Sequence, residues 1–75
     1  MERYKNLNGN SGIAFFEIRS DAIVVQFKNR SKYLYDNAVT GVRHIETMKE
    51  LARSGRGLAT YISKYVKNKY SSHLE

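Results

Sequence analysis

The chain has 75 residues, enough for one small domain. Its 13 lysines and arginines outnumber its 7 acidic residues, which gives a formal net charge of +6, and 41% of its residues are hydrophobic. This apolar fraction excludes a disordered chain, and no apolar run approaches the ~20 residues of a membrane-spanning helix. The sequence has no cysteine, which excludes disulfides, thiolate zinc sites and cysteine nucleophiles. Because so short a chain buries only about 60% of its unfolded surface, a deep enzyme pocket is not expected.

Both ends of the sequence are poor in sizeable apolar residues. Residues 1–11 are rich in asparagine, glycine and serine and are expected to form a flexible segment. They contain no apolar stretch typical of a secretory signal, so a cytoplasmic location is the default expectation. Leu74 and Glu75 resemble a cloning scar before an affinity tag, and residues 71–75 are expected to form a flexible tail. A single domain over residues 12–70 follows.

Three short segments rich in β-branched and aromatic residues follow one another closely. They are Ile13–Ile18, Ala22–Phe27 and Tyr33–Tyr35. The polar links between them are too short for a crossover connection, so neighbouring strands must run antiparallel. These segments predict a three-stranded meander.

Alternation along the strands assigns their faces. Ile23, Val25 and Phe27 share one face of the second strand and are all apolar, so this face is expected to meet the core. Tyr33 and Tyr35 share a face of the third strand. Which face of the sheet the two tyrosines occupy depends on the loop between the strands.

Two loops are possible between the second and third strands. A three-residue loop over Asn29–Ser31 would pair Val25 with Tyr35, whereas a two-residue loop would pair Val25 with Leu34. We favour the longer loop, because Arg30 does not readily adopt the positive φ that a primed two-residue turn requires. This choice places both tyrosines on the core face.

Two helices are predicted after the strands. The first runs from Thr40 to Ser54, with Thr40 as its N-cap and Gly55 just beyond its end. Its apolar stripe consists of Ile45, Met48 and Ala52. The second helix runs from Leu58 to about Lys69, and its apolar seam consists of Leu58, Ile62 and Val66. The predicted fold class is therefore α+β: a three-stranded antiparallel meander followed by two helices packed on one face, in the order β-β-β-α-α.

The sequence offers no catalytic constellation. His44 has no carboxylate or nucleophile at a recognisable spacing and is interpreted as a surface or half-buried residue rather than a catalytic or metal-binding one. The segment Gly55-Arg56-Gly57 precedes a helix start, where free N–H groups can bind an anion. A helix-to-helix turn needs these glycines without any ligand, and this structural interpretation is favoured. No cofactor and no metal are expected.

Basic and aromatic residues alternate in the second hairpin and in the last helix. This combination is typical of nucleic-acid binding, because cations neutralise phosphates and aromatic rings stack on bases. The candidate binding residues are Arg30, Lys32, Arg56, Tyr61, Lys64, Tyr65 and Lys67. A basic face can also serve solubility alone. For Tyr33 and Tyr35, core packing is favoured over stacking, since so small a domain needs their buried area.

Tyr33-Leu34-Tyr35 follows the second predicted strand, and Ser54-Gly55 lies between the two predicted helices. On these motifs and their order, the chain resembles the KTSC domain over residues 12–66. That family comprises small domains of bacterial and phage proteins and a C-terminal domain of some lysyl-tRNA synthetases. Its association with a tRNA-charging enzyme implies RNA binding for this chain, by analogy rather than by chemistry.

The chain departs from the family pattern at several positions. Arg30 stands where the family usually has glycine, and Thr40 stands where it often has proline. At the start of the second helix, Leu58-Ala59 replaces a phenylalanine and an asparagine. Any polar role of that asparagine is therefore not expected at Ala59.

These observations favour a monomeric, non-enzymatic module that binds RNA or another single-stranded nucleic acid. The alternative is a protein-interaction module. A three-stranded sheet leaves an edge that can accept a partner strand, and Ile13 and Phe15 are expected together on one face, opposite Ala14, Phe16 and Ile18. An enzyme is the least expected class, and no membrane association is expected.

Overall fold

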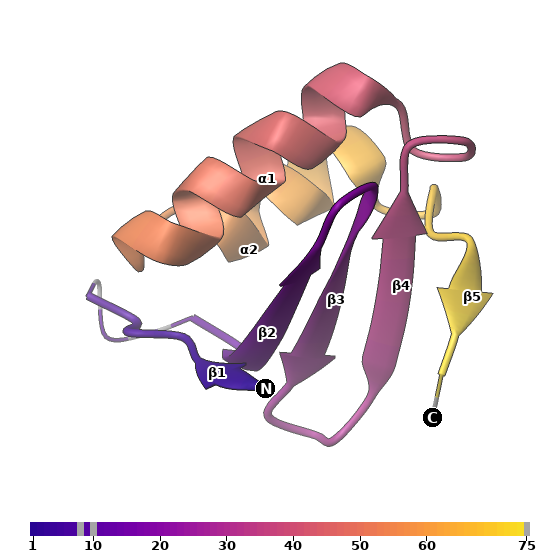
Figure 1. Cartoon of the computed structure of the whole chain (residues 1–75). Helices are drawn as coiled ribbons and strands as arrows, with labels where there is room; N and C mark the ends of the chain where they lie inside the picture. The colour runs from indigo at the N-terminus through magenta and orange to yellow at the C-terminus, as the bar shows by residue number, and fades with distance from the viewer. Residues whose placement is uncertain (8, 10, 75) are drawn as a thin grey trace.

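The computed structural model describes residues 1–7, 9 and 11–74. Its strands are β1 (Glu2–Arg3), β2 (Ile13–Arg19), β3 (Ala22–Phe27), β4 (Lys32–Asp36) and β5 (Ser72–His73). Its helices are α1 (Val42–Ser54) and α2 (Leu58–Tyr61), and α2 continues into a π-helical turn, η1 (Ile62–Val66). The predictions that fall on Asn8, Asn10 and Glu75 concern residues outside this description. Figure 1 shows the two helices side by side over the sheet.

The α+β class is confirmed, but the sheet is larger than predicted. It has five antiparallel strands in the order β1-β2-β3-β4-β5. The three central strands form the predicted meander, and each of its edges is paired with a two-residue strand from one end of the chain. Strands of two residues are too short to show alternation, so sequence reasoning did not find them.

Tyr4 of the N-terminal segment belongs to the core although the predicted domain begins at residue 12, and both terminal segments pair with the sheet. Tyr4 is only 3% exposed. Its backbone N–H donates to the carbonyl of Ala14 at 2.9 Å, which extends the pairing of β1 with β2. At the other end, Ser71 donates its N–H to the carbonyl of Leu34 at 2.7 Å.

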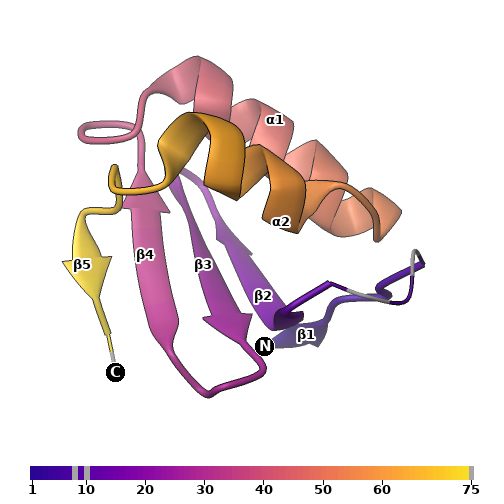
Figure 2. The same cartoon turned by 180° about the vertical axis from the view of Figure 1, so that it is seen from behind.

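The core lies between the two helices and one face of the sheet (Figures 1 and 2). Its buried members are Tyr4, Ile13, Phe16, Ile23, Val25, Tyr35, Ile45, Met48, Ala52, Leu58, Ile62 and Val66. The apolar stripes predicted for both helices are all among these residues, because a 3.6-residue period reports directly which helix face meets the sheet.

The pairing of β3 with β4 differs from the prediction by two residues. Val25 lies opposite Tyr33 rather than Tyr35. The loop has three residues, as predicted, but they are Lys28–Arg30, and Arg30 itself adopts the positive φ of 76° that ends this class of loop. Because the shift is an even number of residues, both tyrosines remain on the face that was predicted for them.

A β-bulge in β2 overturns the predicted faces of its first residues. Ile13 lies opposite Phe27 while Phe15 lies opposite Gln26, so one residue is inserted between them at Ala14. Ile13 therefore turns to the core and is 1% exposed, whereas Phe15 lies on the other face. Ile13 and Phe15 therefore do not share a face, contrary to the prediction.

The helix ends are partly as predicted. Gly55 ends α1 in the left-handed conformation, but the N-cap is Gly41 and no side chain caps the helix. Thr40, the predicted cap, instead donates its hydroxyl to the carbonyl of Lys69 at 2.6 Å. The second helix ends at Val66, three residues before the predicted end.

The close approach of the N-terminal segment to Gly55 generates a stability prediction. An added Cβ at Gly55 would lie 2.6 Å from the Cβ of Lys5, whereas at Gly57 the nearest atom would be 3.6 Å away. Both glycines have positive φ, of 81° and 84°. Gly57→Ala is therefore expected to lower the free energy of unfolding by about 1 kcal/mol, for the backbone alone.

The new Cβ of Gly55→Ala would strain the backbone in the same way and would also displace the N-terminal segment. This variant is therefore expected to lower the free energy of unfolding by about 3 kcal/mol. Urea denaturation of both variants measures the difference, with Gly57→Ala as the matched control for backbone strain. Equal losses in the two variants would show that the N-terminal segment does not pack against Gly55 in solution.

Candidate nucleic-acid interface

The predicted cationic residues fall into two separate groups. Arg56, Lys64 and Lys67 are exposed and belong to the α1–α2 link, to η1 and to the residue after η1. Arg30 and Lys32 belong to the β3–β4 hairpin, which lies at the end of the sheet away from the helices in both views (Figures 1 and 2). We call the first three residues the helix cations.

His44, Tyr61 and Tyr65 form an aromatic cluster on the helices. The rings of Tyr61 and Tyr65 lie 4.7 Å apart between centroids, tilted by 41°, as expected for residues four apart on a helix. The Nδ1 atom of His44 lies 2.7 Å from the hydroxyl of Tyr61, a hydrogen bond that joins α1 to α2. We call these three residues the helix aromatic cluster.

The members of this cluster differ in exposure. Tyr65 is 53% exposed, so one large ring is accessible to a ligand. Tyr61 and His44 are half-buried, which agrees with the interpretation of His44 as a surface or half-buried residue. Sequence reasoning selected Tyr61 and Tyr65 but not the hydrogen bond that orients Tyr61, because His44 comes 17 residues earlier in the chain.

The tyrosines of β4 do not offer a free stacking surface. Tyr35 is 2% exposed and belongs to the core. Tyr33 is half-buried and packs against Tyr70, with 4.7 Å between ring centroids. The ring of His73 stacks on Tyr33 at 4.5 Å with an interplanar angle of 12°. The packing role favoured for this pair is therefore confirmed for Tyr35, and Tyr33 already has an aromatic partner from β5.

Lys32 lies on the sheet face opposite the helices, because it alternates with Tyr33 on β4. The same face carries Glu17 of β2, whose carboxylate accepts a hydrogen bond from Arg19 at 2.9 Å. This hydrogen bond and the charge of Arg19 lower the pKa of Glu17, with lesser contributions from the chain's N-terminal amine and from Lys32. Lys32 therefore lies on the other face of the sheet from the helices, where its positive charge interacts with the carboxylate of Glu17.

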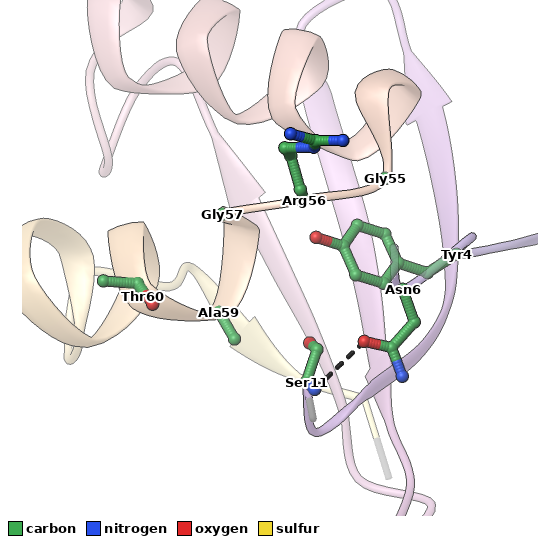
Figure 3. A pocket seen from close by; sticks show the side chains of 8 residues that line it. All are labelled: Tyr4, Asn6, Ser11, Gly55, Arg56, Gly57, Ala59 and Thr60. Carbon is green, nitrogen blue, oxygen red and sulfur yellow. Dashed lines mark hydrogen bonds between the residues drawn. The ribbon is translucent and has the colours of Figure 1, made fainter. Parts of the chain in front are cut away.

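A small pocket lies where the N-terminal segment meets the α1–α2 link (Figure 3). Its volume is about 70 Å³, and Tyr4, Asn6, Arg56 and Thr60 are among the residues that line it. The side chain of Asn6 accepts a hydrogen bond from the N–H of Ser11 at 3.0 Å, as Figure 3 shows. The pocket is too small for a nucleotide, for which a few hundred Å³ are typical.

Gly55 and Gly57 of the α1–α2 link both have a positive φ, which favours glycine, and Gly55 also contacts the N-terminal segment. Gly55 accepts the N–H of Leu7 at its carbonyl, at 2.7 Å, and leaves room for Lys5. The hydroxyl of Tyr4 accepts the N–H of Leu58 at 3.3 Å, which occupies a donor at the start of α2. The turn therefore serves the docking of the N-terminal segment, in agreement with the interpretation that needs no ligand.

The described part of the chain contains neither a metal-binding cluster nor a membrane-spanning helix. No group of three or more histidine, aspartate or glutamate side chains is arranged to hold a metal ion there. In residues 1–7, 9 and 11–74, no helix is long and apolar enough to cross a membrane.

Compared with known proteins, the chain matches no family model, no curated protein and no solved structure. The resemblance to the KTSC domain therefore stays a prediction that rests on the residues quoted for it.

The burial of Tyr35 predicts a pH dependence of stability. Burial, with smaller contributions from Tyr33 and Tyr70, raises its pKa from 10.0 to about 12. Between these two values the unfolded chain releases a proton that the folded chain retains. Stability is therefore expected to fall as the pH rises through this window, by up to about 1.4 kcal/mol per pH unit.

Tyr35→Phe keeps the buried ring and removes the titrating hydroxyl, so its stability is expected to fall less steeply over the same pH window. Urea denaturation at a series of pH values measures both slopes. Identical slopes for the parent chain and the variant would contradict the burial of the Tyr35 hydroxyl.

Proposed function

We propose that the protein is a non-enzymatic module that binds single-stranded nucleic acid, most favourably RNA, through the outer surface of its helices. One observation carries the proposal. The 53% exposed ring of Tyr65 packs beside Tyr61, and the exposed side chains of Lys64 and Lys67 lie within two residues of Tyr65 in the chain.

Each part of this surface has a chemical role in the proposal. Tyr65 stacks on an exposed base, and Tyr61, which is hydrogen-bonded to His44, packs against the ring of Tyr65. The helix cations contact phosphates and release counterions. Stacking on an aromatic ring tolerates any base, so the module is expected to bind with little sequence preference.

The wider π-helical turn supports this assignment. Lys64 and Tyr65 both lie in η1 (Ile62–Val66), and π-helical turns occur frequently at functional sites. Arg30 and Lys32, which were also predicted as binding residues, are not part of the surface in this proposal, because the β3–β4 hairpin lies at the end of the sheet away from the helices.

RNA is preferred over duplex DNA on two grounds. Stacking requires unpaired bases, which single-stranded RNA presents. The resemblance to the KTSC domain adds the association with a tRNA-charging enzyme. The protein-interaction alternative has less support, since β1 and β5 pair with the two edges of the meander and the predicted apolar pair on β2 does not form.

Fluorescence anisotropy with a short labelled single-stranded RNA tests the proposal. Three phosphate contacts from the helix cations predict that log K falls with log salt at a slope of about −2. Tyr65→Ala is expected to weaken binding about tenfold, whereas Tyr65→Phe retains the stacking ring and the affinity. Lys64→Gln is expected to reduce the salt slope by about 0.7.

Arg19→Gln is the matched control. It removes one positive charge from the other face of the sheet, where Arg19 already pairs with Glu17, and is expected to leave the affinity nearly unchanged. An absence of binding at low salt, or binding that does not respond to salt, would refute nucleic-acid binding. Equal effects of Lys64→Gln and Arg19→Gln would refute the assignment to the helix surface.

A further inference from the structure

A groove of about 390 Å³ lies beside the N-terminal strand and shares Tyr4 and Asn6 with the pocket at the α1–α2 link. Three cationic side chains line it: Arg3, Lys5 and Lys28. All three are exposed. Arg3 and Lys5 belong to the N-terminal segment that was predicted to be flexible, and the pairing of β1 with β2 places Arg3 opposite Phe15.

The charged side chains that line the groove are all positive. Among the described residues that line it, none is acidic, and none of its three cations forms an ion pair. Glu2 is the neighbouring carboxylate in the sequence, but it lies opposite Phe16 of β2, whereas Arg3 lies opposite Phe15. Alternation along β1 therefore directs Glu2 to the other face.

The groove also has an aromatic wall. Phe15 alternates with the core residue Phe16 and therefore lies on the face opposite the core, where it lines the groove together with Arg3. Phe15 is half-buried, so the ring is held by its neighbours and keeps an accessible part. The backbone of Lys28 is held next to β2, because its N–H donates to the carbonyl of Gly12 at 2.7 Å.

The groove continues toward the helix cations. Tyr4 and Asn6 line both the groove and the pocket at the α1–α2 link, and Arg56 lines that pocket (Figure 3). A chain of cationic groups therefore leads from Lys28 past the N-terminal strand to Arg56, with no acidic residue among the described lining of either hollow.

We propose that this groove is a nucleotide-binding site that extends the helix surface. Its ligand is one nucleoside phosphate unit of a single strand: Arg3 and Lys28 bind the phosphate, Phe15 contacts the base, and Lys5 binds the next phosphate toward Arg56. The volume of the groove falls within the range of small-ligand sites. If the groove continues the path of a bound RNA, the inference rests on the proposed function. If the groove binds a free nucleotide, the inference is independent of the proposed function.

Two-dimensional NMR of the full chain with a single-stranded dinucleotide tests the site. Binding in the groove is expected to shift the backbone amide signals of Lys5, Phe15 and Lys28. Arg3→Gln and Lys28→Gln are each expected to weaken dinucleotide binding about tenfold, while Lys69→Gln, the matched control, leaves it unchanged. In the anisotropy assay, Lys28→Gln is expected to reduce the salt slope for RNA by about 0.7.

The outcomes separate this inference from the proposed function. RNA binding that depends on Tyr65 but not on Arg3 or Lys28, with no groove shifts, would overturn the groove and keep the helix surface. Groove shifts with the dinucleotide but no RNA binding would support a free-nucleotide site and overturn the proposed function. Equal shifts with inorganic phosphate alone, at equal affinity, would overturn the role of Phe15 and reduce the site to an anion site.

Discussion

The anchoring of Tyr4 between the sheet and the second helix is the contact on which the arrangement of the surfaces depends. Its ring is buried, its N–H pairs with β2, and its hydroxyl accepts the N–H of Leu58. The segment can approach this closely only because Gly55 has no side chain. One residue thus completes the core, orders β1 and sets the boundary between the groove and the α1–α2 link.

Two further side-chain hydrogen bonds join segments that are distant in the sequence. The hydroxyl of Thr40 donates to the carbonyl of Lys69, and the ammonium group of Lys49 donates to the carbonyl of Ser20 at 3.1 Å. Lys49 is only 5% exposed, so its charge is used inside the protein, with Glu46 at 3.7 Å. A net charge of +6 therefore does not measure the charge available to a partner. What matters is which cations the fold leaves on one surface.

The tyrosines show the same division between internal and surface roles. Tyr35 is needed as core, because a domain of this size has few large residues to bury, and alternation predicted its face correctly. Tyr65 is left outside because it lies one position away from the apolar seam of its helix. Spacing four apart identified the pair of Tyr61 and Tyr65, but the contact with His44 crosses between helices and has no local signature.

The sequence by itself determined the order of the main elements, the faces of β3 and β4, the apolar stripes of both helices and the end of α1 at Gly55. Each of these follows from periodicity or from the conformation of one residue, which neighbouring residues reveal. Only the tertiary structure decided the two terminal strands, the bulge at Ala14, the partner of Thr40 and the grouping of Arg3 and Lys5 with Lys28. These features depend on contacts between distant parts of the chain, such as that of Tyr4 with Leu58, 54 residues apart, and no local pattern encodes them.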